Sequence, residues 1–171
     1  MANILEIIFQ IIHNTPFWVW VVLIILVKRG TALMHDGPSS LGKSVIMPLI
    51  FIVWGLNTVV TKFADPDVIL GFYIVSLLPG FLLSYLLYMN RKFYVENGQL
   101  IQAGSKLPIT IMLSNFFVKY FLNVLTAMHP ALYNQMQFNI FYGIISGFTV
   151  GLFFGGIYKT LTAQKQMFTT K

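Results

Sequence analysis

The sequence predicts an all-α integral membrane protein with five transmembrane helices and a small cytoplasmic β-hairpin between the third and fourth helices. Of its 171 residues, 57% are hydrophobic and only 9% are charged. The mean hydropathy is +0.76, whereas a soluble domain carries about 25% charged residues. A soluble core of this length cannot hide so much apolar surface. The composition therefore excludes a soluble enzyme, a disordered chain and a disulfide-rich secreted domain.

The five helices follow from the lengths of the apolar runs, because a helix needs about 20 residues to cross a bilayer. The runs belong to a single membrane domain and cover residues 4–27, 44–63, 68–89, 107–128 and 138–160. Pro48 and Pro79 lie inside two of them. Membrane helices tolerate proline as a kink, so both runs are predicted to stay helical.

The first run contains Pro16 and is compatible with two structures. One is a single helix that bends at Pro16. The other has two pieces: residues 2–12 form an interfacial or re-entrant segment, and a second helix begins with Thr15 as N-cap and Pro16 as first residue.

The distribution of basic residues predicts the orientation. Of the 11 Lys and Arg residues, nine fall on one side of the predicted membrane: Lys28, Arg29, Lys43, Arg91, Lys92, Lys106, Lys159, Lys165 and Lys171. Only Lys62 falls on the other side. Basic residues favour the cytoplasmic side, so we expect the N-terminus outside and the C-terminus in the cytoplasm. Most of the net charge of +6 then reflects orientation, and nucleic-acid binding is not expected. The first run has no basic leading end and no small-residue cleavage site, so it is not expected to be a signal peptide.

A β-hairpin is predicted at residues 92–102. The Asn97-Gly98 pair supplies the positive φ angles of a type I′ turn between two short strands. A lone hairpin is marginal in water, so we expect it to rest on lipid headgroups or on a partner.

Glycines repeat every four residues in the last run, at Gly143, Gly147, Gly151 and Gly155. On a helix this spacing makes a face that a second helix can approach to backbone contact. The face either packs within the bundle or forms the interface of a homodimer.

Lys119 is the one ionisable residue deep inside a predicted span. On a helical wheel Asn115, Asn123 and Thr126 share its face. Three interpretations are open: Lys119 snorkels towards the outer headgroups, forms an ion pair or hydrogen-bond hub, or binds an anion or carries a proton in a cavity. Asn57 and Tyr142 are weaker candidates for lining such a cavity.

Catalytic and metal sites are not expected. Cysteine is absent, and no hydrolase, nucleotide or zinc-protease motif occurs. His13 and His129 are weak metal candidates, since neither has a close ligand spacing. No enzymatic activity and no cofactor are predicted.

Three motifs resemble a family of small bacterial inner-membrane proteins of unknown function. They are His13-Asn14-Thr15-Pro16-Phe17-Trp18-Val19-Trp20, Gly104-Ser105-Lys106-Leu107-Pro108 and Phe117-Val118-Lys119-Tyr120. The first is similar to an opening His-Thr-Pro-x-Trp-Val-Trp, although Asn14 separates His13 from Thr15. Lys28-Arg29-Gly30 also stands where the resemblance implies a Gly-x-Arg-Gln-like turn. The resemblance implies a bacterial envelope protein with a basic residue at the position of Lys119, and it implies no activity.

Three functional hypotheses follow. In the leading one, the protein binds or moves a small anionic or polar solute or lipid, with Lys119 as anchor and Asn115 and Asn123 as hydrogen-bonding neighbours. Five spans are few for a transporter, so a homodimer would suit this hypothesis. In the second, it is a non-catalytic accessory subunit that holds a larger membrane complex through its glycine face or hairpin. The third is a small membrane enzyme or metal-binding protein. Membrane lipids are expected partners in each case.

Overall fold

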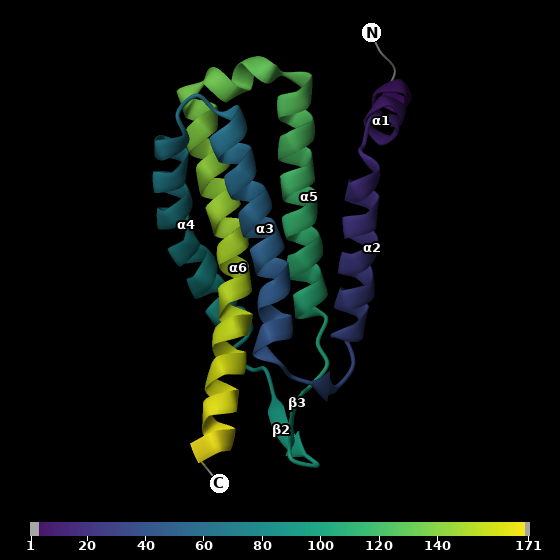
Figure 1. Ribbon diagram of the computed structural model, residues 1–171, viewed down its shortest axis with the longest axis vertical. Helices are drawn as coiled ribbons and strands as arrows, with labels where there is room; N and C mark the ends of the chain where they lie inside the picture. The colour runs from purple at the N-terminus through teal and green to yellow at the C-terminus, as the bar shows by residue number, and fades with distance from the viewer. Residues whose placement is uncertain (1–3, 170–171) are drawn as a thin grey trace.

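The computed structural model describes residues 4–169 as a bundle of helices with a small sheet at one end (Figure 1). Ala2 and Lys171, which enter the sequence-based expectations, lie outside these residues. The elements are α1 (Ile4–His13), α2 (Phe17–Ala32), β1 (Gly37–Pro38), α3 (Leu41–Lys62), α4 (Pro66–Leu87), β2 (Phe93–Glu96), β3 (Gln99–Gln102), α5 (Leu107–Met128), the 3₁₀ helix η1 (Pro130–Asn134) and α6 (Met136–Thr169).

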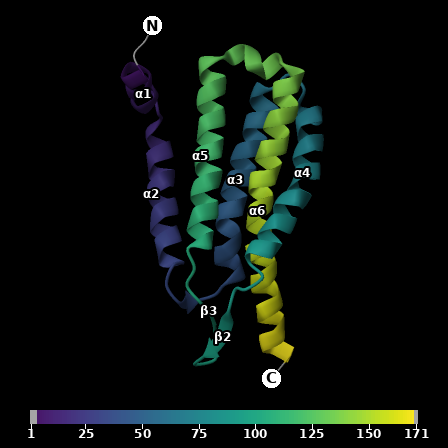
Figure 2. The same ribbon diagram turned by 180° about the vertical axis from the view of Figure 1, so that it is seen from behind.

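The helices from α2 to α6 run alternately up and down the long axis (Figures 1 and 2). The sheet and the C-terminal end of the chain lie at one end of the bundle, and α1 lies at the other. Helix α6 packs closely along α4 and also contacts α3 and α5, while α2 packs against α5 at the edge. The bundle is therefore centred on α6.

The expectation of five spans is not confirmed for the first apolar run. Four helices within residues 4–169 are long and apolar enough to cross a membrane, and they are α3 to α6. The first run is divided between α1 and α2, as the two-piece alternative predicted. Helix α2 has 16 residues, or about 24 Å, which is shorter than the hydrocarbon core of about 30 Å.

Proline causes this division, although not through the predicted cap. Pro16 itself is the N-cap of α2, and no side-chain hydrogen bond caps the N-terminus of this helix. The Thr15 hydroxyl instead donates to the Ile11 carbonyl, 2.6 Å away. Proline has no amide hydrogen and fixes φ, so a helix that continued through Pro16 would lose a backbone hydrogen bond.

The other four runs form helices close to their predicted bounds. Pro48 and Pro79 lie inside continuous helices. The main difference is at the end of α6, which continues to Thr169 instead of stopping near residue 160. No Gly or Pro occurs between residues 157 and 169, so nothing local terminates the helix.

The predicted hairpin is present, and a third strand joins it. Asn97 and Gly98 have φ values of 51° and 75°, and Glu96 pairs with Gln99 across the turn. The short strand β1 pairs with β3, so the strand order is β1-β3-β2. The Asp36 carboxylate accepts hydrogen bonds from the Tyr94 hydroxyl at 2.7 Å and the Gly104 amide at 2.8 Å. The chain itself therefore supports the hairpin.

The glycine face of α6 packs against α4 in the same chain. A Cβ added to Gly147 would overlap the Tyr73 carbonyl oxygen, and one on Gly151 would lie 2.5 Å from the Leu77 carbonyl oxygen. Gly143 and Gly155 face α4 in the same way, with added Cβ atoms too close to Ile69 and Ser84. Because α4 covers this face, a second copy of the chain would have to dock elsewhere.

Candidate functional site

Lys119 points into the bundle. Its side chain is only 1% exposed, which contradicts the snorkelling interpretation. The ammonium nitrogen Nζ lies 5.3 Å from the centre of the Tyr142 ring on α6 and 5.9 Å from that of Tyr73 on α4. Aromatic faces attract a cation at such distances, with about 2 kcal/mol where the site is dry.

The amine also contacts α3, at Gly55. A Cβ placed on Gly55 would lie 3.1 Å from Nζ, so the missing side chain makes room for the lysine. Four helices thus meet around one amine. We call this group the lysine cluster: Gly55 of α3, Tyr73 of α4, Asn115 and Lys119 of α5, and Tyr142 and Ser146 of α6.

Polar atoms without hydrogen-bond partners gather in the lysine cluster. Seven buried side-chain atoms within the described residues have no such partner. Five of them belong to the cluster: Lys119 Nζ, Asn115 Oδ1, Ser146 Oγ and the hydroxyls of Tyr73 and Tyr142. The predicted hydrogen-bond hub around Lys119 is therefore not formed. Each buried polar group left unpaired costs about 1–3 kcal/mol, so this concentration requires a physical explanation.

Besides Lys119, two of the predicted site residues belong to the cluster. Tyr142 lies beside the amine. Asn115 is fully buried, and its amide nitrogen donates to the Thr149 carbonyl at 2.6 Å, which orients the side chain between α5 and α6. The other carboxamide atom, Oδ1, is the one without a partner.

The other two, Asn123 and Asn57, lie outside the cluster. The Asn123 amide donates to the Lys119 backbone carbonyl at 2.7 Å and does not serve the amine. Asn57 is exposed on α3. Both line a groove beside the cluster.

This outer groove has a volume of about 670 Å³ and lies between α1, α2, α3 and α5. Its lining includes Trp18 and Trp54, which meet edge to face at 5.2 Å, and the cation of Lys62. Thr58 lines the groove as well, and its side chain also lies near the Tyr142 hydroxyl of the cluster. Thr58 therefore links the groove to the lysine cluster.

The arrangement has definite chemical possibilities. A cation in an apolar interior is costly unless an anion or hydrogen-bond acceptors surround it. The tyrosine and serine hydroxyls can donate to the same anion. Alternatively the amine can release its proton and take it up again, as intramembrane ionisable groups do in proton pathways.

The histidines do not form a metal site with other ligands. Within residues 4–169 no group of three or more His, Asp or Glu side chains is placed to hold a metal ion. His13 is exposed and stacks on Phe9 with ring centres 6.0 Å apart. His129 is the C-cap of α5.

Sequence reasoning missed Gly55 and Tyr73. Tyr73 is one aromatic residue in a long apolar run, and Gly55 belongs to no repeat, so neither has a local signal. The sequence also suggested only a role in membrane orientation for Arg29, Lys43 and Arg91. The structure brings these three residues to one pocket.

The fold and the cluster define a class: a helix bundle with four helices fit to cross a membrane and a buried, unpaired lysine at its centre. The chain belongs to a family of unknown function, DUF6622, whose match covers residues 3–168. Comparison with curated proteins and with solved structures gave no match.

Proposed function

We propose that the chain is a bacterial inner-membrane protein, with its N-terminus outside and its C-terminus in the cytoplasm, that binds or moves a small anionic or polar ligand at the lysine cluster. One observation carries this proposal: the Lys119 amine is buried without a hydrogen-bond partner, beside the rings of Tyr73 and Tyr142. An anion beside the amine would supply the missing partner. A buried polar network is stable when every member has a partner.

The outer groove supports a route to the cluster. It is amphiphilic, and Thr58 forms part of the wall between the groove and the Tyr142 hydroxyl. A ligand in the groove would reach Lys119 through side-chain rotation, without separation of the helices.

The geometry also limits the ligand. Lys119 is enclosed by α3 at Gly55 and by two aromatic rings. The group that pairs with the amine must therefore be small, such as a carboxylate or phosphate, while the rest of a larger molecule, such as a lipid tail, would stay in the groove. We propose binding without catalysis.

The accessory-subunit alternative has less support. It relied on a glycine face open to a partner, and α4 covers that face. The hairpin is tied to Asp36 and to β1 of the same chain.

Native mass spectrometry of protein extracted gently from membranes tests the proposal. We expect wild-type protein to carry a bound mass that falls about tenfold or more in Lys119→Met, since losing a charged hydrogen-bond partner costs about 1.5–3 kcal/mol. Lys119→Met should also melt at a temperature about 3 °C higher, on a scale of about 1 kcal/mol, because it removes a costly buried charge.

Lys92→Met is the matched control. It removes an exposed lysine that lines neither the groove nor the cluster, so most of the bound mass should remain. Wild-type protein without any bound mass, or equal retention by Lys119→Met and wild type, would contradict the proposal.

A further inference from the structure

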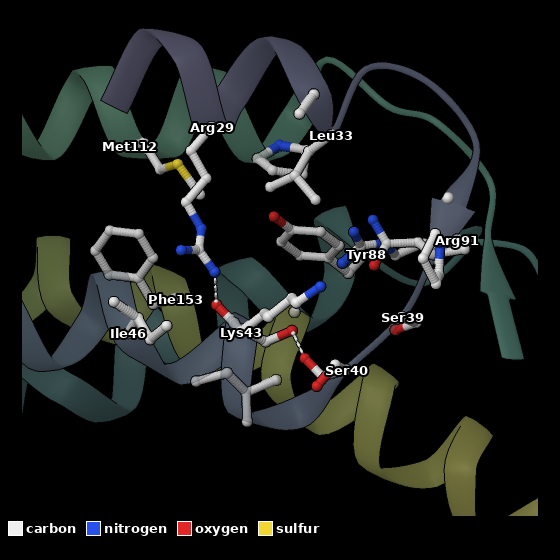
Figure 3. Close-up of a pocket in the computed structure, with 18 of the residues that line it drawn as sticks. Arg29, Leu33, Ser39, Ser40, Lys43, Ile46, Tyr88, Arg91, Met112 and Phe153 are labelled. Carbon is white, nitrogen blue, oxygen red and sulfur yellow. Dashed lines mark hydrogen bonds between the residues drawn. The ribbon is translucent and has the colours of Figure 1, made fainter. Parts of the chain in front are cut away.

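A second site lies at the end of the bundle that carries the sheet. A cavity of about 510 Å³ is formed where α2 ends, α3 begins and α4 ends, and we call it the basic pocket. Arg29, Lys43 and Arg91 line it together with His35, and no Asp or Glu is among its lining residues. Figure 3 shows Arg29, Lys43 and Arg91 gathered around the ring of Tyr88.

Three cationic side chains line the same pocket, and contacts hold the two arginines in place. The Arg29 guanidinium donates to the backbone carbonyl of Lys43, which brings the two residues into contact. The Arg91 guanidinium lies 4.9 Å from the centre of the Tyr88 ring and 5.7 Å from that of Phe93. Like charges at short range are unfavourable unless an anion lies between them.

Two buried polar atoms of the pocket also lack partners. They are Arg91 Nε and the Ser39 hydroxyl, the only such atoms in the described residues outside the lysine cluster. Burial also lowers the pKa of the Arg91 guanidinium below its usual range, as expected for a cation without a nearby anion. Arginine donates in a fork that matches phosphate oxygens.

The inner wall of the pocket is apolar. Met112 and Phe153 are buried in it, and Ile46 is 42% exposed at its edge. Leu49 and Ile50 continue the exposed apolar surface along α3. A phospholipid has an anionic phosphate and apolar acyl chains. The cations at the helix ends match the phosphate, and the apolar path along α3 matches an acyl chain. Basic pockets between membrane helices bind anionic headgroups in this way.

We propose that the basic pocket binds an anionic phospholipid, with its phosphate between Arg29, Lys43 and Arg91 and an acyl chain along α3. This site is distinct from the lysine cluster. It does not depend on the proposed function, since it lies at the opposite end from the outer groove.

The test is a lipid titration of the full-length protein in detergent, read by native mass spectrometry. Phosphatidylglycerol is the anionic probe and phosphatidylcholine the zwitterionic one. We expect the double variant Arg29→Gln/Arg91→Gln to bind phosphatidylglycerol about tenfold or more weakly, because each basic residue near an anionic headgroup contributes about 1 kcal/mol. Arg29→Lys/Arg91→Lys, which keeps both charges, should retain most of the affinity.

Lys28→Gln/Lys92→Gln is the matched control. It removes the same charge from the adjacent positions, which are exposed and do not line the pocket, and should bind within about twofold of wild type because exposed charges are screened. If the arginine variant does not fold, Lys43→Gln at an exposed position replaces it, with an expected loss of about fivefold.

Three results would overturn the proposal. The first is equal binding by the pocket variants and the control variant. The second is equal binding of phosphatidylcholine and phosphatidylglycerol. The third is displacement of the lipid by inorganic phosphate at similar concentrations, which would assign the pocket to a soluble phosphate.

Discussion

The α4–α6 interface and the lysine cluster lie side by side in the same bundle. They differ in whether their buried polar groups have hydrogen-bond partners. At the interface, Ser84 donates to the Leu152 carbonyl of α6 at 2.5 Å, and Ser76 donates to the Tyr73 carbonyl of its own helix at 3.0 Å. Within the lysine cluster, Lys119 and Tyr73 are just as buried, but the lysine amine and the tyrosine hydroxyl have no hydrogen-bond partner. The two regions therefore differ in whether their polar groups are satisfied, although both are buried.

This difference separates packing from binding. Small residues let α4 and α6 approach until backbones touch, and the serine hydroxyls then reach carbonyl oxygens across or along the helices. The cluster gains little stability from its polar groups, since an unpaired buried group costs free energy. An ionisable residue kept at such a cost inside a membrane protein is the basis for proposing a functional site there.

The largest effect is expected from Gly147→Leu, which breaks the interface. The leucine side chain would overlap the Tyr73 carbonyl of α4. Because the obstacle is backbone, we expect a loss of about 3 kcal/mol or more, seen as a loss of monodisperse protein in size-exclusion chromatography. Gly71→Leu on α4 is the control, because nothing lies within 4 Å of an added Cβ there. Equal behaviour of the two variants would show that the interface does not hold the bundle together.

A smaller and more selective effect is expected from Gly55→Ala in the lysine cluster. The new methyl group would lie 3.1 Å from Lys119 Nζ and would displace the amine by a few tenths of an ångström. Alanine favours a helix by about 1 kcal/mol over glycine, so thermal stability should be kept or increased while retention of the bound ligand falls several-fold. Gly71→Ala gains the same helix propensity without touching the amine. If Gly55→Ala retained its ligand as well as Gly71→Ala does, ligand binding would not depend on the position of the Lys119 amine.

The smallest effect is expected from protonating Asp36. Its carboxylate has hydrogen-bond partners and lies at the end of the bundle that carries the sheet. Hydrogen bonds from the Gly104 amide and the Tyr94 hydroxyl hold the pKa of this carboxyl below its ordinary value of 3.8. A depressed folded-state pKa stabilises the fold above the ordinary value, and this contribution is lost as pH falls through the folded-state value. The protection factors of the hairpin amides, which are corrected for the intrinsic pH dependence of exchange, should therefore stay constant down to about pH 4 and fall only below it.

Asp36→Asn isolates this contribution. The hairpin of the variant should exchange faster than that of wild type at neutral pH, while α4 and α6 are unchanged. Identical hairpin protection in both proteins would show that Asp36 does not support the sheet.

Much of the helical architecture could be predicted because its signals are local. Apolar runs of about 20 residues placed α3, α4 and α5 within a few residues of their observed bounds, and Asn97-Gly98 placed the turn. The first run was ambiguous for a local reason as well, since Pro16 can bend a helix or end it. The strand β1 was not predicted because two residues, one of them proline, carry no strand signal.

The lysine cluster was predictable only in part. A lysine within an apolar run is conspicuous, and helical periodicity correctly placed Asn115 on its face. The same periodicity placed Asn123 there, but that side chain turns back to the Lys119 carbonyl. Gly55 and Tyr73 come from other helices, and no spacing within α5 points to them.

By itself, the sequence determined which segments are helical, which of them suit a membrane, and where the unusual residues lie along each helix. These properties depend on hydropathy and on backbone preferences that act within a few residues. Tertiary structure alone decided that α4 covers the glycine face, that Lys119 has no hydrogen-bond partner, and that Arg29, Lys43 and Arg91 share one pocket. The reason is physical: whether a polar group is satisfied depends on atoms from distant segments, and only packing brings those segments together.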